Sequence, residues 1–496
     1  MSDTTGSSGS RLSSLVRAIV IGSKFAAPAG VYGLGTAVAM WVVFFVTHLP
    51  GLDTPPIVVG IALLGCMVIG AGIAGRQFGR TLGWRVGMAS GWTTLKFNLL
   101  LIGAFITKAP EQVTAGQTDP AQGVSGFSMA SLGPVAGFSI ASVAIALIAG
   151  FVGSVSQPRR EAAEFDLTSG TWLPRFAAMT SVVFLPLILI GGLVSTTGSG
   201  MSVRGWPASD GANMFLYPIS LMTSHNSIFL EHSHRLFGTL AGLATLLLTI
   251  WVTLGTSNKL LKGLAWAVLA LVVVQGVLGG FRVTEASLVL ALLHGVAGQV
   301  TFAAAVALSV CLYLSNRPLL SQPILNDDRK LKSFAAGLVH ATLLQLALGA
   351  AFRHLRLDGS SGANHALWAH MGFSIAVVVM AALAATFARS VAREHRDSTL
   401  MRLSTGLIAC IAIQFAIGWL AFFFVFAGHS KDQTILQPDQ LATTQIAIPV
   451  HEILTRTLHQ ANGAVLFGLA SATYVIALFN LRRAKATEMA VPSPTH

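Results

Sequence analysis

The sequence predicts an all-α polytopic membrane protein with about twelve transmembrane helices. Hydrophobic residues make up 53% of the 496-residue chain, charged residues only 10%, and the mean hydropathy is +0.70. Apolar runs long enough to cross a bilayer recur along the chain, with basic residues in the short connections between them. Soluble domains carry about a quarter charged residues, so this composition excludes that class.

The candidate spans are defined by apolar runs close to the ~20 residues that a membrane-crossing helix requires. The run at 86–107 is the weakest, because Lys96 lies inside it. The runs lie at residues 29–48, 55–75, 86–107, 130–153, 174–196, 235–255, 264–283, 288–314, 334–353, 365–387, 403–427 and 458–480.

The positions of the lysines and arginines predict the orientation. If the N-terminus lies inside, alternate connections on the inner side hold most of the 31 basic residues, as the positive-inside rule requires. We therefore expect both termini to be cytoplasmic, in a bacterial plasma membrane. Topology also accounts for the net charge of +12, so this charge does not indicate a nucleic-acid partner.

Ionisable residues stand at the head of the run at 235–255. Glu231, His232, His234 and Arg235 follow one another closely where a membrane helix should begin. Charged groups are costly there and usually mark a function. Glu231 and His234 are three residues apart, so they share one helix face and can act on one bound molecule.

A helical hairpin pattern recurs four times after the polar break at 154–173, where we place a domain boundary. In each hairpin the first helix ends in a glycine-containing apolar stretch and the second opens with a histidine. Three of the four stretches share the pattern Q-x-x-[LI]-G. The pairs are Gly191-Gly192 with His234, Gln275 to Gly279 with His294, Gln345 to Gly349 with His370, and Gln414 to Gly418 with His459.

The predicted topology places all four histidines near the outer ends of helices that run inwards. Four imidazoles at one level suit two bis-histidine haem sites, because haem iron takes axial imidazoles and the porphyrin needs apolar walls. Pairing His234 with His294, and His370 with His459, gives one site per four-helix half. Two alternatives stay open. Each histidine could merely hydrogen-bond within the bundle, or bind zinc, although no cysteine or H-E-x-x-H pattern lies nearby.

These motifs resemble those of haem A synthases. Glu231-x-x-His234-Arg235 is similar to the family's E-x-x-H-R motif, and residues 191–207 resemble the end of its first helix and the following loop. Gln275 to Val283 resembles its third helix, and Leu458 to Ala464 its eighth. The resemblance runs from about 172 to 483, which is the whole eight-helix core of that family.

The resemblance implies a reaction, the oxidation of a methyl group of haem O to the formyl group of haem A, for assembly of an aa3-type terminal oxidase. It implies that His234 and His294 address the substrate haem O, and that His370 and His459 ligate a haem b cofactor. It marks Glu231 as catalytic. A carboxylate one helical turn from an axial histidine could move protons during this chemistry. The alternative is a salt bridge to Arg235 or an interaction with the helix dipole.

Arginines near the predicted outer side are candidate partners for the anionic haem propionates. The alternative for each is ordinary snorkelling towards the membrane interface. The candidates are Arg235, Arg282, Arg353 and Arg456.

The chain also departs from the family. Residues 197–230 contain no cysteine, which excludes any mechanism based on a thiol pair in that loop. No arginine follows His370, and Met371 and His365 are alternative iron ligands there. Residues 29–153 lie outside the resemblance and carry no cofactor pattern, so a partner module, a regulatory element and a docking surface are all open.

We therefore expect an eight-helix core of two pseudo-repeated four-helix bundles, extended by four N-terminal helices, in a haem A synthase-like oxidoreductase. The alternatives are a di-haem b membrane electron carrier and a non-catalytic haem-handling or assembly protein. Expected partners are haem O synthase and cytochrome oxidase assembly factors; the electron donor and a homo-oligomeric state are left open. The segments are a cytoplasmic tail at 1–28, the extra four-helix region at 29–153, the substrate half at 172–320, the haem b half at 330–483 and a cytoplasmic tail at 484–496.

Overall fold

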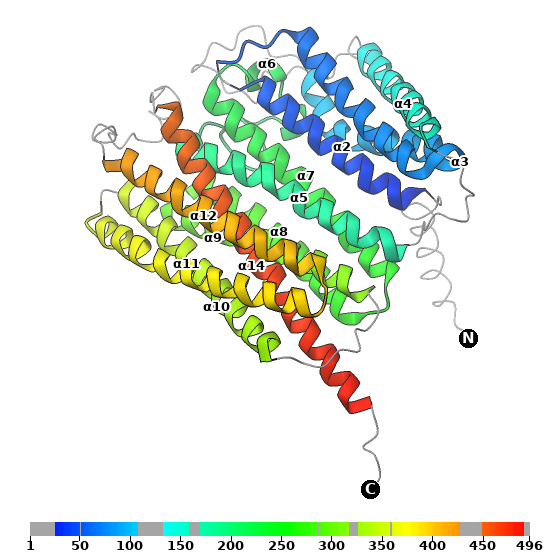
Figure 1. Ribbon diagram of the computed structural model, residues 1–496. Helices are drawn as coiled ribbons and strands as arrows, with labels where there is room; N and C mark the ends of the chain where they lie inside the picture. Colours follow the sequence, from blue (N-terminus) through cyan, green and yellow to red (C-terminus); the bar gives the residue numbers. More distant parts are fainter. Residues whose placement is uncertain are drawn as a thin grey trace, which may run out of the picture. The chain divides into compact units, whose positions relative to one another are not determined.

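The computed structural model is helical in the parts that it describes, apart from the connections, of which that at 197–213 is the longest described (Figure 1). It describes residues 25–49, 51–107, 132–157, 169–285, 287–316, 326–357, 360–426 and 449–490. Within them, eleven helices are long and apolar enough to cross a membrane. The prediction of an all-α polytopic membrane protein is confirmed, and the chain is an integral membrane protein.

The helices follow the predicted runs closely and extend several of them. Their bounds are α2 (Ala26–Thr47), α3 (Pro56–Ile106), α4 (Leu132–Val155), α5 (Ser169–Thr196), η4 (Met214–Leu216), α6 (Ile219–Met222), α7 (Asn226–Gly255), α8 (Lys259–Glu285), α9 (Leu288–Ser315), α10 (Asn326–Leu357), α11 (Gly362–Glu394), α12 (Ser398–Phe426) and α14 (Val450–Ala490).

Helix α3 contains two of the twelve predicted runs, joined by a sharp turn at Gly79. This residue has φ 59° and ψ −169°, a conformation open essentially to glycine alone. A Cβ at Gly83 would lie 2.2 Å from the carbonyl oxygen of Gly75, so the chain folds back on itself here. The arms at 56–78 and 80–106 are therefore antiparallel neighbours, which reconciles eleven long helices with twelve predicted spans.

The chain divides into two compact units, and the division passes through helices α5 and α8. The first unit holds Met1–Val183 and Pro207–Trp266, and the second holds Phe184–Trp206 and Ala267–His496. These units are defined by packing alone. The functional halves expected from the sequence stay a prediction.

The first unit brings the N-terminal helices against the head of α7. Helix α2 packs on the second arm of α3, where Trp41 donates from Nε1 to Oδ1 of Asn98 at 3.1 Å. From the same helix, Phe45 stacks on Phe229 with ring centroids 5.3 Å apart, and Trp41 meets Phe237 edge-on at 5.4 Å. The aromatic face of α7 is therefore covered by the N-terminal region.

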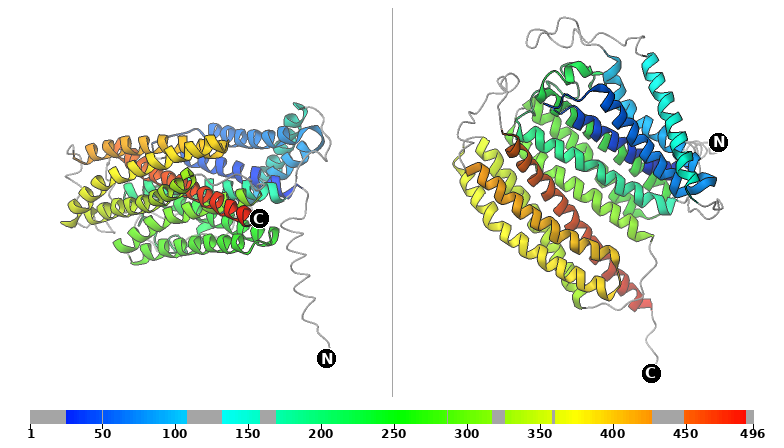
Figure 2. Two further views of the ribbon diagram at one scale, coloured as in Figure 1. Left: turned by 60° about the horizontal axis from the view of Figure 1, so that its bottom comes forward. Right: turned by 45° about the horizontal axis from the view of Figure 1, so that its top comes forward.

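The second unit contains a four-helix bundle of α10, α11, α12 and α14, with α9 against it (Figure 2). Each of these four helices contributes a leucine or valine to one buried cluster. The four contributors are Leu338, Val377, Leu407 and Leu466. Burial of these side chains supplies the packing that holds the histidine-bearing helices α11 and α14 in register.

Candidate functional site

Three of the repeated hairpins build the same local socket, in which a histidine ring lies on a glycine of the preceding helix. A Cβ at Gly349 would come within 2.9 Å of Cε1 of His370. The equivalent distances are 3.1 Å from Gly279 to His294 and 3.0 Å from Gly418 to His459. The glycine is therefore required by close approach of the ring, since any side chain there would occupy the space that the imidazole fills.

The glutamine four residues before each socket glycine contacts the histidine through the glutamine's own backbone and side chain. In each socket the histidine is hydrogen-bonded to the glutamine's backbone. For His370 the distance from Nδ1 to the Gln345 carbonyl oxygen is 3.0 Å, and the Gln345 amide nitrogen donates to the His370 carbonyl at 2.9 Å. A histidine whose Nδ1–H donates to a carbonyl presents an unprotonated Nε2, the form that ligates metals.

The other two sockets vary the glutamine side-chain contacts. With its amide oriented to suit its neighbours, Gln275 donates to the carbonyl of His294 at 3.1 Å. In the last hairpin, the amide nitrogen of Gln414 lies 3.2 Å from Nδ1 of His459. Asn462 fixes this amide by donating to its oxygen at 2.8 Å. The Q-x-x-[LI]-G pattern is thus a structural device that orients an imidazole.

The rings of His370 and His459 face one another inside the second unit. Their centroids are 6.2 Å apart and their planes are inclined by 75°. A metal ion bound by two imidazole nitrogens at about 2 Å each would hold the ring centroids about 6 Å apart. The donor set and its spacing therefore fit one iron between two axial histidines. The alternative ligand His365 is exposed, and it is His370 that occupies the socket.

The structure does not extend this description to the first predicted pair. His234 belongs to the first unit and His294 to the second, so their pairing stays a prediction. Gly192, the expected counterpart of the socket glycines, approaches the side chain of Thr457 instead, at 3.0 Å from the position of a Cβ. The first hairpin lacks the Q-x-x-[LI]-G pattern, and this difference agrees with its different packing.

Glu231 is buried at the head of α7 and forms an ion pair with Arg235. The distance from Oε1 to Nη2 is 2.7 Å, and both side chains are less than 10% exposed. Arg235 also donates from Nη1 to the carbonyl oxygen of Ala208 at 3.0 Å. The ion pair that was the alternative interpretation of Glu231 is therefore present. It leaves the carboxylate fixed in position beside the turn that carries His234.

The segment 207–217, here called the clamp, packs against the start of α7. Ser209 lies 3.3 Å from Nδ1 of His232, whose ring packs on Tyr217 at 4.7 Å between centroids. Tyr217 donates its hydroxyl proton to Oδ2 of Asp210 at 2.8 Å. Burial, and secondarily the Asp210 carboxylate, raises the pKa of Tyr217, so this phenol stays protonated at neutral pH. His232 is fully buried and contacts this clamp.

Three of the four candidate arginines lie in the second unit, where their charges interact. Arg353 donates from Nη1 to Oε1 of Gln460 at 3.3 Å. The guanidinium of Arg282 lies over Gly200, because a Cβ there would be 2.4 Å from its Nη2. Arg456 forms an ion pair with Glu452. The mutual repulsion of Arg353, Arg456 and Arg282, of which Arg456 is paired with Glu452, indicates a positive environment suited to an anionic ligand.

Two further polar residues were not singled out from the sequence. Glu452 is buried at the head of α14, and its pairing with Arg456 repeats the Glu231–Arg235 arrangement four residues apart on α7. This E-x-x-x-R repeat was readable in the sequence. Asn462 carried no such signal, because its role depends on Gln414 of another helix.

Within the described residues, no group of three or more histidine, cysteine or acidic side chains could hold a metal ion. Cys66, Cys311 and Cys410 are free thiols. In the part of the chain that the structure describes, His370 and His459 bring two imidazoles together, the number that a bis-histidine haem takes.

Residues 174–372 match the family described as cytochrome oxidase assembly protein, COX15-CtaA. A haem A synthase of Geobacillus kaustophilus is 30% identical over 185 residues, which are 36% of this chain and 55% of that protein. One from Rhodopseudomonas palustris is 29% identical over 220 residues, covering 37% and 56%. One from Symbiobacterium thermophilum is 29% identical over 266 residues, covering 48% and 82%.

The chain spans about half the length of the first two of these relatives, and its N-terminal helices α2 to α4 lie outside the family match. The match covers the segment from α5 to His370, which contains the E-x-x-H-R motif and two of the three glutamine–glycine–histidine sockets. Through this region, the chain is similar to the cytochrome oxidase assembly protein (COX15-CtaA) family and to haem A synthases.

Proposed function

We propose that this protein is a haem A synthase-like membrane oxidoreductase, which oxidises a methyl group of haem O to the formyl group of haem A for an aa3-type oxidase. The observation that carries the proposal is the opposed pair His370 and His459. Each ring is held by its socket glycine and glutamine, and the 6.2 Å between the two ring centroids suits axial ligation of one iron.

In this proposal His370 and His459 hold a haem b cofactor, which supplies one-electron transfer when bound. Arg353 and Arg456 neutralise its propionates, since they lie near the C-terminal end of α10 and the N-terminal end of α14, the ends that we expect on the outer side. Apolar residues of the bundle wall exclude water from the porphyrin faces. Ion pairs between these guanidinium groups and the haem propionates would favour the orientation of the haem in which its propionates point towards the outer side.

His234 and His294 address the substrate haem O, with Arg235 and Arg282 as partners for its propionates. Glu231 would accept or deliver protons at its carboxylate oxygens as the methyl group is hydroxylated twice, first to an alcohol and then to a gem-diol, which loses water to give the formyl group; the electrons removed would leave through the haem b cofactor. The ion pair with Arg235 holds the Glu231 carboxylate in position, so we expect proton transfer at carboxylate oxygens that stay in contact with Arg235. Haem O synthase and cytochrome oxidase assembly factors are the corresponding partners.

A second candidate function is a di-haem b electron carrier. The ion pair between Glu231 and Arg235 favours it, because that contact gives Glu231 a structural role without any chemistry. Two bis-histidine haems would then serve electron transfer alone. The two candidates make opposite predictions for the substitution of Glu231.

The test is haem extraction with mass spectrometry after expression of the full chain in a host that makes haem O but not haem A. Haem A is expected with the wild type. Glu231→Gln should lower its yield at least a hundredfold, the scale of a lost general acid–base group, while haem b is retained. His294→Ala should also abolish haem A. Glu285→Gln, at the exposed end of α8, is the matched carboxylate control and should leave the yield unchanged.

Haem b without haem A, unchanged by Glu231→Gln, would instead establish the electron carrier. Folded protein that contains no haem would contradict both functions and leave the histidine sockets as packing devices. The fold of each variant is checked by its helical circular dichroism and its thermal midpoint.

A further inference from the structure

Lys96 lies on the second arm of α3, outside the region that matches the family, and its side chain is exposed. The structure describes contacts on the other faces of this arm. Thr94 donates to the carbonyl oxygen of Gly33 on α2 at 3.1 Å, and Gly91 abuts Ala146 on α4. Lys96 shares the remaining face with Trp92 and Leu99, each 53% exposed.

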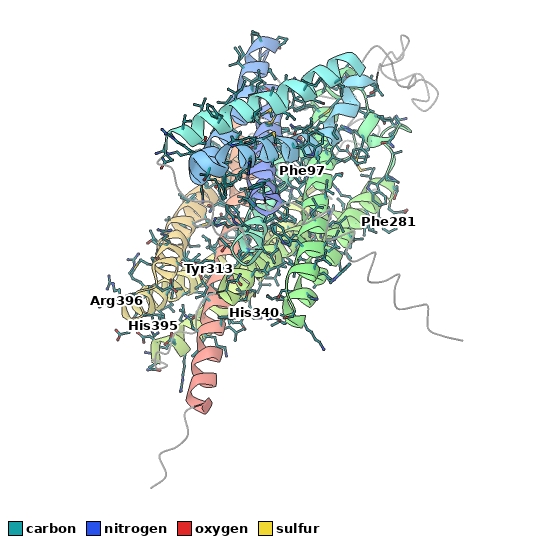
Figure 3. The ribbon with its side chains drawn as sticks, turned by 90° about the vertical axis from the view of Figure 1, so that its right-hand side faces the viewer. Phe97, Phe281, Tyr313, His340, His395 and Arg396 are labelled. Carbon is teal, nitrogen blue, oxygen red and sulfur yellow. The ribbon has the colours of Figure 1, made fainter. Side chains whose placement is uncertain are left out.

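The depth of Lys96 follows from the residues on either side of it. Thr94 contacts Gly33, and Asn98 accepts from Trp41, so Lys96 lies level with the stretch of α2 between these residues. That stretch is the middle of α2, which runs from Ala26 to Thr47. Figure 3 marks Phe97, the next residue along this arm. Lys96 is therefore near the midplane of the membrane.

Snorkelling does not bring this ammonium group to water. Ten residues separate Lys96 from the end of the helix at Ile106, which is roughly 15 Å of helix at 1.5 Å per residue. The distance to the turn at Gly79 is greater, and a lysine side chain is much shorter than either. The nitrogen lies 5.9 Å from the ring centroid of Trp92, a cation–π contact that offsets only part of the cost of burying a charge in hydrocarbon.

Charged residues at this depth almost always face a bundle interior or pair with an opposite charge. The helices that the structure describes do not supply that charge. Within the described spans, no acidic residue lies in the central third; Glu231 and Glu452, for example, are within six residues of the helix start. A second copy would bring another lysine to the same depth. A helix of a different polypeptide can supply the counter-charge at this depth.

We infer that the face of α3 formed by Trp92, Lys96 and Leu99 binds a transmembrane helix of another protein that carries a carboxylate near the membrane midplane. The charge specifies the chemistry of the partner, and the two flanking apolar side chains provide the surface against which its helix packs. This inference concerns a part of the chain that the proposed haem chemistry does not use, so it stands independently of that proposal.

The test uses the full-length protein in vesicles of zwitterionic phosphatidylcholine and synthetic single-span peptides of leucine and alanine. One peptide has an aspartate at its centre, and two matched peptides have asparagine or leucine there. Binding is measured by energy transfer between labelled protein and labelled peptide. The wild type should bind the aspartate peptide at least ten times more tightly than the leucine peptide.

Lys96→Met should remove this preference and Lys96→Arg should keep it. Lys262→Met, near the start of α8, is the matched control and should also keep it. Equal binding of all three peptides by the wild type would overturn the inference without recourse to any variant. A preference for the aspartate peptide that survives in folded Lys96→Met would also overturn it. A wild-type dimer that dissociates in Lys96→Met would overturn it too, because the face would then bind a second copy of this chain.

Discussion

At the scale of single residues, the orientation of the candidate iron ligands depends on glycines, whose lack of a side chain makes room for a histidine ring. Gly279, Gly349 and Gly418 each leave room for one imidazole, and the glutamine four residues earlier hydrogen-bonds that histidine through its backbone. A histidine fixed in this way loses little freedom when it binds a metal, because its orientation is already determined.

Substitution of Gly349 by alanine tests the socket. The new methyl group would come within 2.9 Å of Cε1 of His370, so the ring must rotate away from its place opposite His459. We expect haem content to fall at least tenfold, measured as haem per protein from the absorption spectrum. Helix content should change little, because an imidazole can move more easily than a backbone.

Gly372→Ala is the matched control on the neighbouring helix α11, where nothing lies within 4 Å of the new Cβ. It should retain full haem content. Equal haem content in Gly349→Ala and Gly372→Ala would show that the close approach of glycine to histidine has no part in binding.

At the scale of elements, ion pairs and turns position the helices that carry these residues. Two helices that bear predicted axial histidines, α7 and α14, each begin with a buried glutamate paired to an arginine four residues later. Glutamate at this end also interacts favourably with the helix dipole. The shared arrangement supports the internal repeat, although Glu231 is three residues before His234 and Glu452 is seven before His459.

Gly79 forms the turn between the two arms of α3, so its substitution should lower the stability of the N-terminal region. Its φ of 59° and ψ of −169° are strained for any residue with a Cβ. Gly79→Ala should destabilise the protein by about 1–3 kcal/mol, seen as a lower thermal midpoint in detergent. Gly65→Ala, in the first arm with nothing within 4 Å, should be neutral or slightly stabilising. Comparable midpoints for the two variants would contradict the hairpin turn.

At the scale of the whole molecule, the N-terminal helices support a helix of the family region. Phe45 of α2 stacks on Phe229 of α7, two residues before Glu231, and the ring planes are inclined by only 12°. The extension that no family motif explains thus packs on the helix that carries the proposed catalytic carboxylate. Its removal would expose an aromatic face of α7.

A double-mutant cycle on Phe45→Leu and Phe229→Leu measures this support. The coupling free energy should be about 0.5–1.5 kcal/mol, as for other aromatic pairs. Thermal or denaturant unfolding of the full chain provides the measurement. Phe45→Leu combined with Phe334→Leu, whose ring stacks on Phe387 in the other unit, is the control and should show additive effects. Additivity in the first pair would mean that the two rings do not support one another.

The sequence by itself determined the fold class, the spans, the Glu231 motif and the histidine repeat. Hydrophobic length and glycine spacing are local properties, and a membrane allows few other ways to satisfy the backbone. It also raised the salt bridge of Glu231 to Arg235 as an alternative, because four residues along a helix bring two side chains together.

Only the tertiary structure decided which groups meet across helices. The opposition of His370 and His459, the hold of Asn462 on Gln414 and the packing of α2 on α7 join residues far apart in the chain. Their distances depend on how helices pack, and neither composition nor periodicity specifies that. The same reason explains Lys96: the sequence placed a charge inside a span, but helix packing decided that it faces outwards.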